Sequence, residues 1–410
     1  MSFPRYPQYK DSGVDWLGQV PAHWEVKRLR FLAELNPSKS EVAALERGTL
    51  VSFIPMDSVG DDGSLKLETE KTLAEVETGY TYFRDGDVTI AKITPCYENG
   101  KGAVMRGLTN GIGFGTTELI VARPRSDALR SDYLHYLFIS SEFRALGESQ
   151  MYGAGGQKRV PDSFVRDFAT AFPPLPEQRQ IAAFLDRETG KIDALVAEQE
   201  RLLELLKEKR QAVISHAVTR GLNPNAPLKP SGLAWLGDVP AHWKVKALKR
   251  LAKLVTGITP PTDKPENYSE DEGYSWVRPE DLNESGAPTL ATKHLSDVGW
   301  RCVRRVAPDS SLICCIGTIG KVGFVRTEVS TNQQLTAAEF SYGHRYFFYA
   351  LRAARAELEI SATGNVIQIL NSERLGNIKF PAPPADEAEL VAAHLDAATA
   401  QFDALTAAVE

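Results

Sequence analysis

The chain opens each of its halves with nearly the same twelve residues, Trp16-Leu-Gly-Gln-Val-Pro-Ala-His-Trp-Glu-Val-Lys27 and Trp235-Leu-Gly-Asp-Val-Pro-Ala-His-Trp-Lys-Val-Lys246. Ten of the twelve positions are identical, at an offset of 219. A second repeat closes each half at an offset of 210, where Pro173-Pro174 and Leu185-Asp186 recur as Pro383-Pro384 and Leu395-Asp396. A period of about 210 residues is too long for a solenoid. The sequence therefore predicts a duplicated unit, in which a globular domain is followed by a helix.

The helix that closes the first half is predicted by its apolar periodicity. Apolar residues recur in steps of four and three from Ile181 to about Ala217, and charged residues occupy the other faces. The stripe residues are Ile181, Leu185, Ile192, Leu195, Leu202, Leu206 and Val213 in the first half, and Val391, Leu395, Phe402 and Leu405 in the second. We expect the two stripes to pair as an antiparallel coiled coil. The alternative is two amphipathic helices that each pack on their own domain.

The rest of each half has a mixed pattern. Short apolar runs broken by Gly, Pro and Asp, such as 48–54 and 87–93, predict short strands. Helical patterns follow near 131–147 and 345–360, and short basic helices are expected at 26–35 and 245–255. The sequence thus predicts an α/β (mixed α+β) fold. Its parts are globular domains at 1–175 and 221–380 and long helices at 176–220 and 381–410.

Composition narrows the class of protein. The 410 residues are 43% hydrophobic and 24% charged, which is ordinary for a soluble chain of two to three domains. No apolar run is long enough to span a bilayer, and the N-terminus lacks the apolar stretch of a secretory signal. Four cysteines without a Cys-x-x-Cys pair favour neither a disulfide framework nor structural zinc. We therefore expect a cytoplasmic protein without a membrane partner.

The charge distribution leaves room for basic surfaces. The net charge of −6 argues weakly against a nucleic-acid partner. Residues 381–410 contain six acidic and no basic residues, so they account for the whole deficit. The remainder of the chain is neutral overall.

These features together resemble the specificity subunit of type I restriction–modification systems. The Trp-Leu-Gly-x-Val-Pro-x-His-Trp openings resemble the segment that precedes each target-recognition domain in that family. Phe172-Pro-Pro-Leu-Pro-Glu-Gln178 and the helix after it are similar to its proximal conserved helix. Gly86–Lys101 and Ile316–Lys321 resemble a strand–turn element of its recognition domains, as do Gly115–Leu119 and Thr331–Leu335. The second copy departs from this pattern, because Pro-Ala-Pro-Pro-Ala-Asp-Glu387 lacks the Glu-Gln pair and its helix stops about ten residues short of the first.

The resemblance implies a non-catalytic chain in a larger enzyme. Each recognition domain would read one half of an asymmetric, two-part site in double-stranded DNA. The helices would set the gap between the halves and dock two modification subunits, which methylate adenine at N6, and restriction/translocase subunits would join them. No cofactor is expected in this chain. S-adenosylmethionine is expected on the modification subunit, and ATP and Mg on the restriction subunit.

DNA reading calls for Arg or Lys against phosphates and guanine, and for Asn or Gln against adenine. For each candidate a solvated surface side chain is the alternative interpretation. The candidates in the first domain are Lys92, Lys101, Arg106, Gln157, Lys158 and Arg159. The candidates in the second domain are Arg278, Lys293, Arg301, Arg304, Arg305, Lys321, Asn332, Gln333 and Gln334.

A catalytic site finds little support. His23 and His242 stand beside Trp and Pro in the repeat, where packed, hydrogen-bonded anchors are favoured over ligands. Cys96 lacks the flanking motif of a nucleophile, and Cys314-Cys315 lie in an apolar run that predicts burial in a strand. Phosphate-loop, zinc-protease, nucleophile-elbow and methyltransferase motifs do not occur. The rival functions are a two-domain coiled-coil scaffold without a DNA role and the recognition subunit of a related restriction class, with an enzyme of unknown type last.

Overall fold

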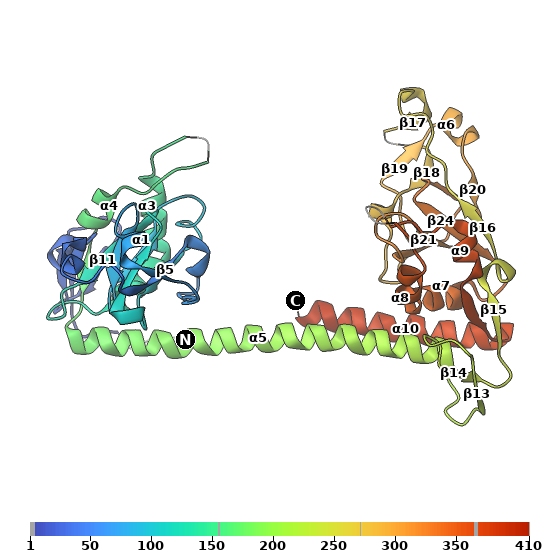
Figure 1. Cartoon of the computed structure of the whole chain (residues 1–410), viewed down its shortest axis with the longest axis horizontal. Coiled ribbons are helices and arrows are strands. Elements are labelled where there is room, and N and C mark those ends of the chain that lie inside the picture. The colour runs from blue at the N-terminus through green and yellow to red at the C-terminus, as the bar shows by residue number, and fades with distance from the viewer. Residues whose placement is uncertain (1–4, 155, 271, 365–367, 410) are drawn as a thin grey trace. The chain divides into compact units, whose positions relative to one another are not determined.

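The computed structural model describes residues 5–154, 156–270, 272–364 and 368–409. The chain divides into two compact units, Met1–Ala194 and Leu195–Glu410. The division falls inside the longest described helix, α5 (Leu175–Arg220), which is drawn in green in Figure 1. The prediction of a mixed α+β fold with two globular domains and a long helix is confirmed.

The first unit is built around two four-stranded sheets, with strand orders β6-β5-β10-β7 and β4-β11-β8-β9. Two short antiparallel pairs, β1-β2 and β12-β3, complete it. Its strands are β1 (Tyr9–Asp11), β2 (Gln19–Pro21), β3 (Glu25–Arg28), β4 (Ala33–Leu35), β5 (Leu50–Ile54), β6 (Glu70–Thr72), β7 (Thr81–Arg84), β8 (Val88–Ala91), β9 (Gly102–Val104), β10 (Ile112–Gly115), β11 (Leu119–Pro124) and β12 (Ala169–Phe172). Its helices besides α5 are α1 (Leu73–Val76), α2 (Ser131–Ile139), α3 (Ser141–Ser149) and α4 (Asp162–Asp167).

The second unit has a four-stranded sheet, β16-β24-β21-β22, and a five-stranded sheet, β17-β19-β18-β23-β20. The pairs β13-β14 and β15-β25 accompany them. Its strands are β13 (Leu228–Pro230), β14 (Asp238–Pro240), β15 (Lys244–Ala247), β16 (Ala252–Thr256), β17 (Tyr268–Ser269), β18 (Tyr274–Val277), β19 (Lys293–Leu295), β20 (Arg305–Val306), β21 (Ser310–Cys314), β22 (Val322–Val325), β23 (Val329–Thr331), β24 (Leu335–Phe340) and β25 (Lys379–Ala382). Its helices are α6 (Asp297–Arg301), α7 (His344–Ala353), α8 (Arg355–Ile360), α9 (Ser372–Asn377) and α10 (Ala385–Val409).

The two units share one topology, apart from the additional edge strand β17 of the second. In each, one sheet is wholly antiparallel, and the other contains a single parallel pair, β5 with β10 in the first unit and β18 with β23 in the second. In each, the strand after the Trp-Pro opening pairs with the strand that leads into the long helix, as β3 does with β12 and β15 with β25. The duplication read from two short repeats therefore extends through both domains.

The short basic helices expected at 26–35 and 245–255 are wrong. Residues 25–35 form β3, a single 3-10 turn (Leu29–Phe31) and β4, and the second copy repeats this order. Strand β3 pairs with β12 from the far end of the first domain, Arg28 opposite Ala169, so the pairing left no local signal. Long-range pairing here overrides a local helical pattern.

Each unit buries its own core. In the first, Leu29, Ile120 and Phe143 lie in an apolar cluster between the sheet of β11 and the helices α2–α4. In the second, aromatic residues of α7 such as Tyr346 and Phe348 fill the equivalent place. None of the described helices is long and apolar enough to cross a membrane.

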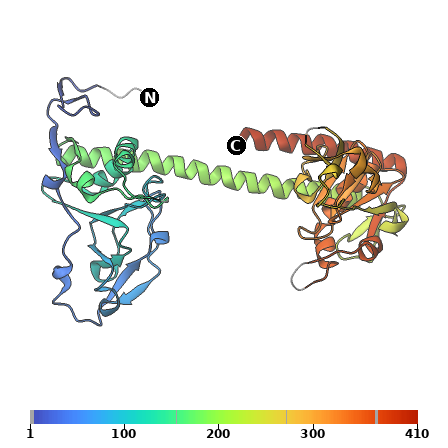
Figure 2. The same cartoon turned by 90° about the horizontal axis from the view of Figure 1, so that it is seen from above.

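Helix α10 packs against the last turns of α5 within the second unit (Figure 2). Arg210 of α5 donates a hydrogen bond of 2.7 Å to Asp403, and Ile214, Ala217 and Val218 share a buried cluster with Val391 and Leu395. Gly221, at the end of α5, lies instead beside Glu387, at the start of α10. The contacts run in opposite senses along the two helices, so the packing is antiparallel.

Candidate functional site

Four of the candidate DNA contacts in the first unit come together beside β8. Tyr152 is bridged to Arg159, and Arg159 is bridged in turn to Ile93. The amide of Val160 donates to the carbonyl of Lys92 (2.8 Å), and that of Thr94 donates to Lys158 (3.0 Å). The four candidates gathered in this way are Lys92, Gln157, Lys158 and Arg159.

These four side chains are not equally free to meet a ligand. Arg159 is held by Glu118 in a two-pronged ion pair, with N–O distances of 2.9 and 2.8 Å. Gln157 and Lys158 are exposed, and so is Tyr152, which is 62% exposed. These three residues therefore present an amide, an ammonium group and an aromatic ring to solvent. The Arg159–Glu118 ion pair fixes the adjoining residue of the chain.

Lys101 and Lys321 occupy equivalent places in the two units. Each follows a glycine with positive φ, Gly100 at 78° and Gly320 at 77°, in the turn after β8 or β21. The Lys101 ammonium donates to the carbonyl of Met56 (3.3 Å), and the Lys321 ammonium donates to that of Pro279 (3.0 Å). Both lysines, although candidate DNA contacts, tie a turn to the segment that follows the parallel strand.

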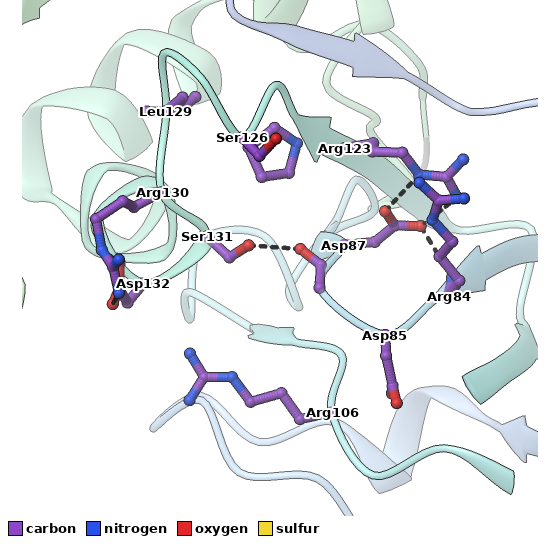
Figure 3. Close-up of a pocket in the computed structure, with 12 residues that line it drawn as sticks. Arg84, Asp85, Asp87, Arg106, Arg123, Ser126, Leu129, Arg130, Ser131 and Asp132 are labelled. Carbon is purple, nitrogen blue, oxygen red and sulfur yellow. Dashed lines mark hydrogen bonds and ion pairs between the residues drawn. The ribbon is translucent and has the colours of Figure 1, made fainter. Parts of the chain in front are cut away.

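Arg106 lines a cavity of about 330 Å³ in the first unit, shown in Figure 3. Its side chain extends toward the part of the cavity that carries Arg130 and Asp132, and it makes no ion pair within 4 Å among the described residues. On the far side, Arg123 is bound to the buried Asp87 at 2.7 Å and also to Glu41. Asp87 and Glu41 raise the pKa of Arg123, although its burial opposes them, so this guanidinium stays charged.

In the second unit, Arg278 and the Asn-Gln-Gln segment are largely engaged inside the fold. The Arg278 guanidinium contacts Glu280 at 2.8 Å and donates to Thr292 at 3.1 Å. Asn332 is buried and exchanges hydrogen bonds with Gln334. Gln333 is exposed, and its amide oxygen accepts a hydrogen bond from the Thr259 hydroxyl.

The remaining second-unit candidates lie around the five-stranded sheet. Arg305 is placed over the ring of Trp300 at 5.5 Å, and Trp300 in turn stacks on Tyr274 with 4.5 Å between ring centroids. Arg304 donates to the carbonyl of Thr256 at 3.1 Å. Lys293 on β19 and Arg301 at the end of α6 are exposed. The surroundings of this sheet therefore combine exposed cations with a stacked aromatic pair, both of which can contact nucleic acid.

The stripe residues of the long helices are buried only where the helices meet. Val391 and Leu395 of α10 are fully buried, and Leu206, Val213 and Phe402 are half-buried. In the first unit Ile181 and Leu185 are half-buried too. The exposed members are Ile192 and Leu195 (60% each), Leu202 (44%) and Leu405 (52%). The predicted antiparallel pairing therefore covers the last turns of α5, and its middle turns carry an exposed apolar face.

The repeated histidines are hydrogen-bonded anchors, as the sequence favoured. His23 lies 2.8 Å from Glu177 in the first turn of α5, and the Trp24 indole donates to the same carboxylate at 3.1 Å. In the second copy His242 and Trp243 meet Glu387 of α10 at 2.7 and 2.9 Å. Sequence reasoning missed these carboxylates as partners, although Glu177 and Glu387 recur at the same offset of 210 as the rest of the closing repeat.

Two of the four cysteines are placed as structural residues. Cys314 and Cys315 are buried at the end of β21, and burial raises the pKa of both thiols, that of Cys315 to about 12. Within the described ranges no group of three or more His, Cys, Asp and Glu side chains is arranged to hold a metal ion. Sequence reasoning also missed the Arg123–Asp87–Glu41 network, because its members lie far apart in the chain and carry no spacing signal.

Comparison with known proteins relates the chain to one family. Residues 240–409 match the model of the type I restriction modification DNA specificity domain. The chain is 22% identical over 388 residues to the putative MjaX specificity subunit of Methanocaldococcus jannaschii, covering 93% of this chain and 88% of that one. Residues 240–409 belong to the type I restriction–modification specificity-domain family, and the chain as a whole is similar to specificity subunits. The resemblance drawn from the sequence motifs is thereby confirmed.

Two further relatives match more closely over a shorter length. The EcoAI and EcoEI specificity subunits of Escherichia coli are 46% and 42% identical over 189 residues, which are 46% of this chain. The chain spans only 31% of the length of each of these relatives.

Two solved structures share the fold. A chain from a study of assembly and conformational transition in a type I system superimposes with a TM-score of 0.75 and 18% identity, covering 95% of this chain and 93% of that one. The HsdS subunit of Thermoanaerobacter tengcongensis gives a TM-score of 0.58 and 18% identity, with coverages of 95% and 91%.

Proposed function

We propose that this chain is the DNA-specificity subunit of a type I restriction–modification complex and that each unit reads one half of an asymmetric, two-part site. The observation that carries the proposal is one topology repeated with different exposed chemistry. Both units keep the turn lysines Lys101 and Lys321 tied to a carbonyl. The segments Gly115–Leu119 and Thr331–Leu335 occupy equivalent places in the two units. The exposed residue at their middle position is Thr117 in the first unit and Gln333 in the second. A common scaffold with different exposed groups suits the reading of two different half-sites.

The exposed candidates have the chemistry that DNA reading requires. Guanidinium and ammonium groups suit phosphate oxygens and guanine, and carboxamides suit adenine. Arg106, Lys158 and Gln157 supply these groups in the first unit, and Arg301 and Gln333 supply them in the second. Candidates whose side chains are hydrogen-bonded within the fold, such as Arg159 and Asn332, hold the neighbouring DNA-contacting residues in position instead.

The long helices serve assembly in this proposal. The exposed apolar residues in the middle turns of α5 would be covered by two adenine-N6 modification subunits, because apolar faces of this kind mark protein contacts. Those residues are Ile192, Leu195, Val196, Leu202 and Leu205. The chain itself would be non-catalytic and free of cofactors. S-adenosylmethionine would belong to the modification subunits, ATP and Mg to restriction/translocase subunits, and the complex would act in the cytoplasm.

The test is single-molecule methylome sequencing of the native strain with and without this gene. We expect deletion to remove N6-methyladenine from every copy of one asymmetric, two-part sequence, and we expect a plasmid copy to restore it. An unchanged adenine methylome in the deletion strain would contradict the proposal. It would favour the rival in which the chain is a scaffold without a DNA role.

A further inference from the structure

A cavity of about 590 Å³ in the first unit is lined mainly by arginine side chains. Its lining contains five guanidinium groups and a single carboxylate, that of Glu34. The arginines are Arg30, Arg84, Arg123, Arg125 and Arg166. They come from the 3-10 turn Leu29–Phe31, from β7, from the end of β11 and the residue directly after it, and from α4.

Two of the guanidinium groups are held by carboxylates outside the lining. Arg123 is buried and binds the buried Asp87, with an N–O distance of 2.7 Å. Asp87 also accepts a hydrogen bond of 2.9 Å from the backbone amide of Arg84, which lies beside Arg123 in Figure 3. Arg30 lies 2.6 Å from Asp167. Part of the cavity wall is therefore fixed before any ligand arrives.

The other three guanidinium groups are loosely paired or unpaired. Arg84 lies 3.5 Å from Glu41, and Arg166 lies 3.5 Å from Asp167, both longer than a direct charge-assisted hydrogen bond. Arg125 is exposed and makes no ion pair within 4 Å among the residues that the structure describes. The five cations meet one carboxylate in the lining and three outside it, so at least one positive charge stays uncompensated.

The second unit replaces two of these arginines. Lys249 stands at the position of Arg30, at an offset of 219, and Gly376 stands at the position of Arg166, at an offset of 210. A Cβ atom on Gly376 would lie 3.3 Å from the Cβ of Lys249, which is a tight contact. The second unit therefore has neither the charge of Arg166 nor much room for a side chain in its place.

A third arginine is replaced by the opposite charge. In the register of β4 with β11, Arg123 lies opposite Glu34. In the register of β16 with β24, Glu339 lies opposite Lys253 and pairs with it at 2.9 Å. The residue two positions after Glu339, which corresponds to Arg125, is a serine. The shared fold therefore does not require arginines at these positions.

The lining has the chemistry of a site for several phosphate groups. Guanidinium groups bind phosphate oxygens in pairs, and the volume lies in the usual range for small ligands, about 300–1,000 Å³. Because the arginines come from four parts of the unit, an anion with one charged group would reach only some of them. None of the ten described residues of the lining is aromatic, so the cavity offers no ring on which a base could stack.

The cavity and the candidate DNA contacts lie at opposite ends of one pair of strands. Strands β8 and β11 are antiparallel, and Asp87 directly precedes β8 while Arg123 lies near the end of β11. At the other end of the pair, Lys92 follows β8, and Glu118, which holds Arg159, precedes β11. A ligand in the cavity would therefore leave the candidate DNA contacts free.

We propose that this cavity binds a free anion that carries two or more phosphate groups, at a site separate from the DNA-reading surface. A nucleotide and an inorganic polyphosphate share the required chemistry, which is a chain of phosphate groups. This site goes beyond the proposed function and does not depend on it.

The first experiment is a calorimetric titration of the purified full chain with tripolyphosphate at low ionic strength. We expect saturable binding at one site, and binding of orthophosphate that is at least about tenfold weaker, because a single phosphate reaches fewer of the arginines. Arg125→Ala and Arg166→Ala should each weaken tripolyphosphate binding at least about fivefold. Arg201→Ala removes the same charge from an exposed position on α5 and is the matched control.

Three outcomes of this titration would overturn the site: no saturable binding, orthophosphate binding as tight as that of tripolyphosphate, or equal effects of Arg125→Ala and Arg201→Ala. Parallel titrations with adenosine triphosphate and adenosine separate the two sources of the phosphate chain. Tighter binding of adenosine triphosphate would identify a nucleotide as the ligand, and tighter binding of tripolyphosphate an inorganic chain. Binding of adenosine alone would contradict a site built for phosphate.

The second experiment separates the cavity from the DNA-reading surface. Fluorescence anisotropy of a labelled DNA duplex is measured with the same variants and with Lys158→Ala. We expect Lys158→Ala to weaken duplex binding and to leave tripolyphosphate binding unchanged. Arg125→Ala should change duplex binding no more than Arg201→Ala does. Loss of duplex binding with Arg125→Ala as large as that with Lys158→Ala would make the cavity part of the DNA surface and overturn a separate site.

Discussion

Glu177 and Glu387 each join the start of a long helix to the Trp-Pro opening of the same unit. The Glu177 carboxylate accepts hydrogen bonds from Tyr6 and Trp24 and lies 2.8 Å from His23. Removal of either carboxylate leaves an indole N–H without its acceptor, that of the half-buried Trp24 or of the fully buried Trp243, and an unsatisfied donor of this kind costs about 1–3 kcal/mol. We expect Glu177→Ala and Glu387→Ala each to lower the free energy of unfolding by that amount in urea titrations. Glu198→Ala, at an exposed position on α5, is the control and should change it by less than about 0.5 kcal/mol.

The same carboxylate predicts a dependence on pH. Burial alone would raise the pKa of Glu177, but the hydrogen bonds from Tyr6, His23 and Trp24 outweigh it and hold the pKa below its usual value. A folded-state pKa below that of the unfolded chain, about 4.3, means that the stabilisation is complete above that pH and is lost as the pH falls through the folded value. The stability gap between the wild type and Glu177→Gln should therefore be constant from pH 7 to about 5 and narrow toward pH 3. A gap that widens below pH 5 in urea titrations would contradict this account.

At the residue scale, the role of a side chain was predictable from the sequence only where a local repeat marked it. His23 and His242 were predicted as anchors because each stands in a repeat beside Trp and Pro, which is a local signal. Lys101 and Lys321 look like DNA contacts in sequence, yet their ammonium groups reach carbonyls 45 and 42 residues away. No spacing rule connects residues that meet only through sheet pairing, so roles of this kind had to come from the structure.

At the scale of elements, the packing of α5 is confined to its last turns. Ile214 is fully buried in the core of the second unit, whereas Leu202, three turns earlier, is 44% exposed. Truncation of a buried aliphatic side chain typically costs about 2–5 kcal/mol. We expect Ile214→Ala to destabilise the second unit by that amount in urea titrations, and Leu202→Ala by less than about 0.5 kcal/mol. Equal effects would mean that the middle of α5 is packed as tightly as its end.

The elements that periodicity defines were predicted well, and those that depend on pairing were not. The strands expected at 48–54 and 87–93 are β5 and β8, and the helices expected near 131–147 and 345–360 are α2 with α3 and α7 with α8. The prediction of a short basic helix at 26–35 was wrong because β3 pairs with β12, which lies at the other end of the first domain in sequence. The apolar stripe of α5 predicted a helix correctly but could not reveal which of its turns α10 covers.

Helix α5 also yields a prediction about the spacing of the half-sites. Four residues inserted after Glu200 lengthen the helix by about 6 Å and leave the contacts of Arg210 and Ile214 with α10 in place. B-DNA rises about 3.4 Å per base pair. If α5 sets the gap between the half-sites, the methylated sequence should gain one or two base pairs in its spacer and keep both halves. The methylated sequence of each variant is read by long-read sequencing. An active variant with an unchanged spacer would show that α5 connects the two units without setting the gap between the half-sites.

For the whole molecule, the duplication is the feature that the function has to explain. Apart from the additional strand β17, the two units repeat one strand order, one turn lysine and one helix anchor, and they diverge at exposed positions such as Thr117 and Gln333. A scaffold protein without a DNA role would have no need for two copies that differ in this way. Two readers of different half-sites would require it.

The most direct test of this account replaces residues 30–170, the part of the first unit between the two repeats, with the matching domain of a relative whose methylated sequence is known. The exchanged gene is placed at the native locus, and the N6-methyladenine sequence is read by single-molecule sequencing. The account predicts a new two-part sequence in which one half comes from the relative and the other half is unchanged. A sequence in which both halves change, or in which neither does, would contradict the claim that each unit reads one half-site.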